Sequence, residues 1–173
     1  MIKTSKRIRL AIAVTSLTLL AAAPASAEEG PQSPTARDVL SAAVTDFIQP
    51  GYRTFRDKAQ AMGAAITPLC EAPSAPGLEV ARKAFGELVR AWSEIEIIRF
   101  GPVVDDNRLE RILFFPDRRG IGLKQIQQVL AEKDETATTP ERLAAKSVAL
   151  QGLTTLEYLL YGTGAEDLAG GDE

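Results

Sequence analysis

The most informative segment of the chain is SVALQGLTTLEYLLYG, residues 147–162. Its apolar residues recur every three or four positions, so at about 100° per residue they fall on one broad arc of a helix. A polar stripe lies opposite and consists of Ser147, Gln151, Thr154 and Tyr158. Gly152 falls inside the apolar face, where a glycine costs a helix about 1 kcal/mol relative to alanine. We therefore expect either close packing by a neighbouring helix or a site that needs the space.

The same periodicity divides the rest of the chain into helical regions. It predicts a first region from Ser33-Pro34 to Leu69, either two helices end to end or one helix kinked at Pro50. A second helix is expected over about 78–100 and a third over 121–132. A fourth opens at Thr139-Pro140 and ends at Gly162. No segment has a convincing strand pattern, so the predicted fold class is all-α. We expect a four-helix-bundle-like domain with a long irregular loop, residues 101–119, between the second and third helices.

Residues 1–27 are typical of a signal peptide. Four basic residues precede an apolar run, residues 10–23, and Ala25-Ser26-Ala27 supplies small residues for cleavage. The run is too short for a membrane span, and no later segment reaches the roughly 18 apolar residues that a span needs. We therefore expect export to the periplasm and no membrane span. Residues 28–33 are predicted to be a disordered leader, 34–162 the helical domain, and 163–173 a flexible acidic tail without core contacts.

Composition argues against several classes of protein. Without the four basic residues of the signal peptide, 16 basic and 23 acidic residues remain, a net charge of −7. This charge argues against nucleic acid or an anionic membrane as the main partner and favours cations, small molecules or other proteins. The chain contains no histidine, so neither a histidine-dependent catalytic site nor a histidine-ligated zinc site can be built from it. The one cysteine, Cys70, is expected either to be buried or to pair with a cysteine outside this chain.

Charged residues follow the inward-facing apolar stripe of the second predicted helix, which consists of Leu78, Ala81, Phe85, Leu88, Trp92 and Ile95. Glu96 lies four residues after Trp92 and three before Arg99, near the interior end of that helix. Since an unpaired buried charge is very costly, these two charges should either form an ion pair or contribute to a ligand or metal site. The irregular segment that follows contains arginines that would either bind an anion or neutralise nearby acids: Arg108, Arg111, Arg118 and Arg119.

Three segments together carry a resemblance to a known family. They run from Ala91-Trp92 to Pro102, from Asn107-Arg108 to Gly120, and from Ser147 to Leu160. In combination they resemble the imelysin-like family of exported bacterial helical proteins, which is grouped with a proposed metallopeptidase family. The resemblance implies a periplasmic or outer-membrane-associated location and frequent linkage to iron acquisition. It also implies a fold of two helical bundles, of which this chain looks like the N-terminal half.

The signature of that family is Gly-x-His-x-x-Glu, which in a helix places histidine and glutamate where both could face one metal. Here it falls on Gly152, Thr154 and Glu157, so threonine stands in place of histidine. A hydroxyl is a poor substitute for imidazole as a ligand of a transition metal, which argues against a metal-dependent peptidase. An oxygen-only site is the alternative, in which Glu157, Glu96 and Asp117 would bind iron or another hard cation such as calcium.

We therefore expect an exported, imelysin-like binding module without peptidase activity, associated with iron or haem uptake. The alternatives are a metal-dependent peptidase of the family and a helical domain that binds a protein partner. Besides the three carboxylates, the residues expected to contact a metal ion or small ligand are Gly152, Thr154, Gln151, Trp92, Arg99, Arg108 and Arg119.

Overall fold

The computed structural model describes residues 33–170, and this part of the chain contains helices and no strand. The predicted all-α fold class is thus confirmed. The described residues hold seven α-helices rather than the four we expected. A π-helical segment divides the first predicted region into α1 and α2, a break divides the last predicted helix into α6 and α7, and α4 lies within the predicted loop. The predicted signal peptide and nearly all of the predicted leader lie outside the described residues.

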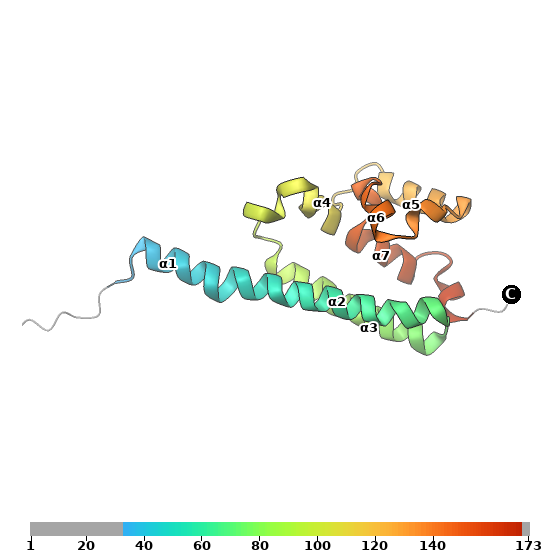
Figure 1. Ribbon diagram of the computed structural model, residues 1–173, viewed down its shortest axis with the longest axis horizontal. Coiled ribbons are helices and arrows are strands. Elements are labelled where there is room, and N and C mark those ends of the chain that lie inside the picture. Colours follow the sequence, from blue (N-terminus) through green and yellow to red (C-terminus); the bar gives the residue numbers. More distant parts are fainter. Residues whose placement is uncertain (1–32, 171–173) are drawn as a thin grey trace, which may run out of the picture. The chain divides into compact units, whose positions relative to one another are not determined.

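A long helical hairpin forms the base of the fold (Figure 1). α1 (Ala36–Ala42), a π-helical segment (Ala43–Ile48) and α2 (Gln49–Glu71) follow one another without a break, and α3 (Ala75–Ile95) lies beside α2. The first region is therefore one long helix. Its irregular turn lies just before Pro50, where the ring would collide with the carbonyl group four residues earlier and the missing N–H removes a helical hydrogen bond. The helix starts two residues later than predicted, because Thr35 and Asp38 form a capping box.

The core is centred on α3. The stripe predicted from its sequence is buried, as Leu78, Ala81, Phe85, Leu88, Trp92 and Ile95 show. These side chains pack against Met62 and Leu69 of α2, and against Leu153 and Leu160 farther along the chain. However, α3 ends at Ile95 and not near residue 100. The chain turns away over the next residues to reach Gly101, which has a φ of 70° and precedes a proline, a combination that excludes helix continuation.

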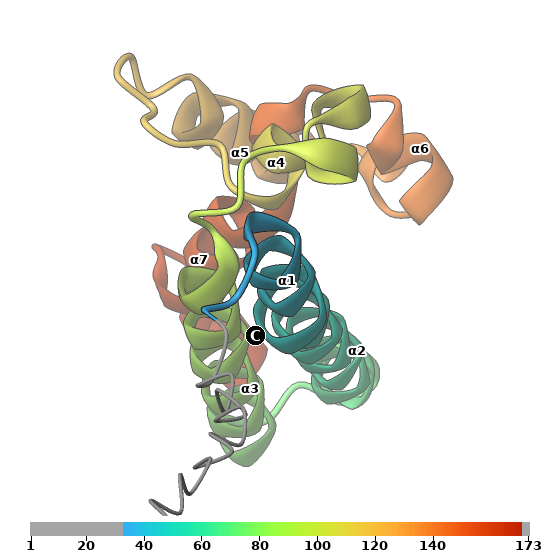
Figure 2. The ribbon, with the colours of Figure 1, turned by 90° about the vertical axis from the view of Figure 1, so that its left-hand side faces the viewer.

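The second half of the chain lies along one side of the hairpin (Figures 1 and 2). It contains α4 (Arg108–Ile112), α5 (Ile121–Glu132), α6 (Pro140–Ala144) and α7 (Gly152–Tyr161), with short 3-10 turns at 101–103, 105–107, 135–137 and 148–150. α7 contacts both α3 and α5. The predicted bounds of α5 are confirmed, and so is the Thr139 cap before Pro140, since the Thr139 hydroxyl accepts the N–H of Arg142.

The prediction of a single helix from residue 140 to residue 161 is wrong. Residues 145–151 leave the helical path, and Gly152 begins α7 with a φ of 74° rather than lying inside a helix. A Cβ atom at Gly152 would collide with the carbonyl oxygens of Arg111 and Ile112. The expected close approach at Gly152 therefore exists, but it is made by the backbone of α4, and a left-handed conformation of the glycine permits it.

Two further expectations are changed by the structure. The C-terminal segment was expected to lack core contacts, yet residues 165–169 form a 3-10 helix in which Ala165 is buried and Leu168 packs on the core. Cys70 is exposed and free, so the buried alternative is excluded.

None of the helices within residues 33–170 has both the length and the apolar character that crossing a bilayer requires.

Candidate functional site

The three carboxylates expected to bind a cation come from different parts of the fold. Glu157 is exposed on α7, Glu96 is partly buried just after α3, and Asp117 precedes α5. Within residues 33–170, no group of three or more acidic or cysteine side chains is placed to hold a metal ion. The structure therefore does not gather these three residues into one metal site.

Asp117 acts as a cap for α5. Its carboxylate oxygens accept the backbone N–H groups of Ile121 at 2.7 Å, Gly122 at 2.9 Å and Leu123 at 3.4 Å. These N–H groups belong to the first turn of the helix and have no partner within it. An acidic side chain at this end also interacts favourably with the helix dipole. The carboxylate of Asp117 is thus already engaged by the backbone.

Gln151 and Arg111 connect the break before α7 to α4. The side-chain amide nitrogen of Gln151 lies within hydrogen-bond distance of the carbonyl oxygens of Leu143, Lys146 and Ser147, at 3.1–3.3 Å. Its amide oxygen accepts a hydrogen bond from Arg111, whose guanidinium also donates to the carbonyl oxygen of Ala144. Because these groups bond one another and the backbone, the geometry assigns Gln151 a structural role in holding the corner.

The other arginines have different surroundings. Arg108 forms ion pairs with Asp106 at 3.0 Å and Asp105 at 3.8 Å, as expected if the arginine cluster neutralises nearby acids. Arg118 and Arg119 are exposed. Arg99 donates to the carbonyl oxygen of Glu96 rather than to its carboxylate. The ion pair expected between these two residues is not formed, because α3 ends before Glu96 and the helical spacing does not continue to Arg99.

Trp92, Glu96 and Arg99 nevertheless line one cavity. This cavity, of about 390 Å³, lies between the end of α3 and the segment around α4, and we call it the Trp92 pocket. Its remaining lining residues are Leu109, Glu110, Leu113 and Phe115. The Trp92 side chain is 3% exposed and packs in a tilted arrangement against Phe55, with ring centroids 5.2 Å apart.

The indole nitrogen of Trp92 has no hydrogen-bond partner among the described residues. An unpaired buried donor costs about 1–3 kcal/mol. The pocket thus brings two carboxylates and one guanidinium beside Trp92, whose indole nitrogen is buried and unpaired. Sequence reasoning missed Glu110 and Phe115, because they reach the pocket only when the irregular segment folds back towards α3, and no local pattern encodes that contact.

Comparison with known proteins identifies the family. The family model described as Imelysin matches residues 48–172, most of the chain. The chain belongs to the imelysin family. No curated protein and no solved structure matched it. The match includes α2 to α7 and therefore both the Trp92 pocket and the imelysin signature segment.

The residues at the imelysin signature do not fit a transition-metal site. Thr154 supplies a hydroxyl where an imidazole is needed, and Glu157 is exposed with no third ligand gathered around it among residues 33–170. Gly152 is explained by the contact with α4, and Gln151 by the carbonyl groups that it binds. In this imelysin chain Gly152 and Gln151 of the signature segment are thus engaged by the protein backbone, and Thr154 does not supply the ligand that a transition metal prefers.

Proposed function

We propose that this chain is an exported binding module of the imelysin family without peptidase activity, and that it binds its ligand in the Trp92 pocket. The observation that carries the proposal is that Glu96, Glu110 and Arg99 line one pocket with Trp92, whose buried N–H group is unpaired. Family membership supports only the imelysin part of the proposal. The absence of histidine removes the residue that the family signature would require for metal-dependent hydrolysis.

The pocket has groups for both signs of charge. Glutamate carboxylates are the ligands that hard cations such as ferric iron or calcium prefer. The guanidinium of Arg99 is a donor, so it favours an oxygen-bearing anion instead. A cation chelated by a small carboxylate would pair with both glutamates and with Arg99 at once. This ligand class agrees with a role in iron uptake, and the excess of acidic residues would favour approach of the cation.

Binding can be followed through Trp92, which is the single tryptophan of the chain. The full chain would be titrated with ferric citrate, with citrate alone and with calcium chloride, recording tryptophan fluorescence and melting temperature. We expect ferric citrate to quench the fluorescence saturably and to raise the melting temperature, because a ligand that binds only the folded state stabilises it. The proposal is wrong if none of the three gives a saturable change.

The matched pair of variants is Glu96→Gln and Glu94→Gln. Both replace a glutamate near the end of α3, but Glu94 is exposed and lies outside the Trp92 pocket. We expect Glu96→Gln to weaken ferric citrate binding at least tenfold and Glu94→Gln to leave it unchanged. Equal weakening by both variants would indicate a general charge effect and would contradict the assignment of the pocket.

The peptidase alternative has its own test. The chain would be incubated with an unfolded protein substrate and zinc, manganese or iron, beside Glu157→Ala. We expect no metal-dependent cleavage. Cleavage that disappears in Glu157→Ala would establish the peptidase and refute the non-catalytic assignment.

Export is tested separately. N-terminal sequencing of the protein recovered from a periplasmic fraction should begin at Glu28, immediately after the predicted cleavage site. Recovery of the uncleaved chain from the cytoplasm alone would refute export.

A further inference from the structure

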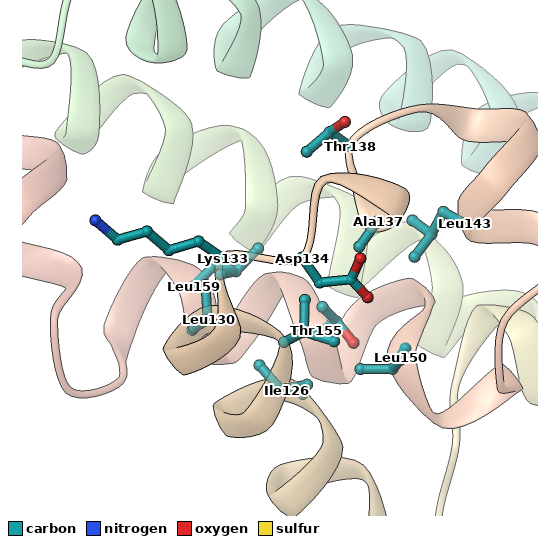
Figure 3. Close-up of a pocket in the computed structure, with 11 residues that line it drawn as sticks. Ile126, Leu130, Lys133, Asp134, Ala137, Thr138, Leu143, Leu150, Thr155 and Leu159 are labelled. Atoms are coloured by element: carbon teal, nitrogen blue, oxygen red, sulfur yellow. The ribbon is translucent and has the colours of Figure 1, made fainter.

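A second cavity lies away from the Trp92 pocket. It is an open pocket of about 430 Å³, lined by α5, α7 and the segment between them, and we call it the α5–α7 pocket (Figure 3). Its wall is mainly aliphatic and includes Ile126, Leu130, Leu143, Leu150 and Leu159. The volume and the aliphatic lining are typical of sites that bind small apolar molecules.

The polar group of interest in this wall is Thr155. This residue lies on α7, and its hydroxyl oxygen is buried without a hydrogen-bond partner among the described residues. Threonine in a helix has two accessible χ1 rotamers, so a rotation can turn the hydroxyl towards a ligand in the pocket. A buried hydroxyl without a partner is destabilising, and a ligand that carries a hydrogen-bonding group would supply the missing partner.

The charged groups around the pocket leave it close to neutral. Asp134 lines the pocket, but its carboxylate is bound by Lys146 at 2.7 Å and by the backbone N–H of Thr136 at 2.8 Å. Lys133 also lines it, yet its side chain extends away from the other lining residues in Figure 3. Neither sign of charge is therefore presented to a ligand. This balance favours a neutral ligand over a carboxylate or an amine.

We propose that the α5–α7 pocket binds a neutral aliphatic molecule with a single hydroxyl or carbonyl group, which forms a hydrogen bond with Thr155. The hydrocarbon part contacts the aliphatic wall, and the polar group satisfies the threonine hydroxyl. The site is independent of the Trp92 pocket, since the two share no lining residue.

The probes are 1-octanol and octanoate, which have chains of equal length and differ in charge. Calorimetric titration and thermal melting of the full chain should show saturable binding of 1-octanol and a higher melting temperature, with octanoate at least tenfold weaker. Failure of 1-octanol to bind saturably would overturn the proposal, and so would tighter binding of octanoate.

Two threonine variants test the hydrogen bond. Thr155→Val keeps the shape of the side chain and removes the hydroxyl, so 1-octanol should bind about fivefold more weakly while the melting temperature of the free protein stays equal or rises. Thr154→Val is the matched control, because Thr154 precedes Thr155 on α7 and does not line the pocket. An equal effect of both variants on affinity would overturn the role of Thr155.

A third variant tests the location. Ala137 lines the pocket from the 3-10 turn, and Ala137→Leu should fill part of the cavity and compete with 1-octanol. Retention of full affinity by this variant would place the ligand elsewhere. If the chain instead sedimented as a dimer that Ala137→Leu dissociated, the pocket would be an interface between copies, and the proposal would be refuted.

Discussion

The Nη1 atom of Arg111 lies 3.0 Å from the Oε1 atom of Gln151, so a residue of α4 is joined to the residue that precedes α7. The same guanidinium nitrogen reaches the carbonyl oxygen of Ala144 at 2.9 Å, the last residue of α6. Together the two side chains bind carbonyl groups at and just after the end of α6, where helical hydrogen bonding stops. This arrangement holds three short elements, α4, α6 and α7, at one corner.

Replacement of Gln151 should therefore destabilise the fold. Gln151→Ala removes the partner of Arg111 and of several backbone carbonyl groups, and we expect the free energy of unfolding in urea to fall by about 2 kcal/mol. Combination with Arg111→Met should be clearly non-additive, because the two residues share one network. Gln60→Ala, at an exposed position on α2, is the control and should change stability by less than about 0.5 kcal/mol. If Gln151→Ala changed the free energy of unfolding no more than Gln60→Ala does, the structural role of Gln151 would be contradicted.

Two glycines should respond to alanine in opposite directions. Gly152→Ala forces a side chain into the left-handed region and against carbonyl oxygens of α4, so we expect a loss of at least about 2 kcal/mol. Gly86 lies in the exposed interior of α3 with nothing near an added Cβ, and Gly86→Ala should stabilise by about 0.5–1 kcal/mol. Denaturant unfolding measures both. A stabilising effect of Gly152→Ala would show that residue 152 is helical, as the sequence pattern alone suggested.

The cap formed by Asp117 should contribute to stability independently of metal. Asp117→Ala removes the acceptor for three N–H groups at the start of α5, and we expect a loss of about 1 kcal/mol in the free energy of unfolding. The loss should be the same with and without added ferric citrate. If Asp117→Ala also abolished the stabilisation by ferric citrate, Asp117 would be a cation ligand as well as a helix cap.

Acidification should remove the contribution of the Asp134 carboxylate to the stability of the fold. The hydrogen bond from Lys146, followed by those from Thr136, lowers the pKa of Asp134 from its ordinary 3.8 to about 2. A carboxyl group with a lowered pKa in the folded state stabilises the fold above its unfolded pKa, and this stabilisation is lost as the pH falls towards the folded pKa. Asp134→Asn should therefore melt at a lower temperature than the parent at pH 5–7, and the difference should shrink between about pH 4 and pH 2.

The control for this pH profile is Lys146→Met, which removes the other partner of the ion pair. The difference in melting temperature between Lys146→Met and the parent should likewise shrink between about pH 4 and pH 2. A difference between the parent and Asp134→Asn that stays constant from pH 7 to pH 2 would show that the ionised form of Asp134 contributes nothing.

Local patterns predicted several elements correctly. The apolar stripe of α3, the bounds of α5 and the Thr139 cap of α6 follow from helical periodicity and capping chemistry, which act within a few residues. Trp92, Glu96 and Arg99 were grouped from their spacing, and they line one pocket in the structure. Their role in binding a ligand remains a prediction.

The amino-acid sequence by itself determined the all-α class, the buried face of α3 and the absence of histidine chemistry, because periodicity and composition are properties of the chain alone. Only the tertiary structure decided that residues 145–151 break the last predicted helix, since the conformation of Gly152 depends on carbonyl groups of α4, some 40 residues earlier in the chain. It also separated Asp117 and Glu157 from the Trp92 pocket. Contacts between distant segments, which no local pattern records, set both results.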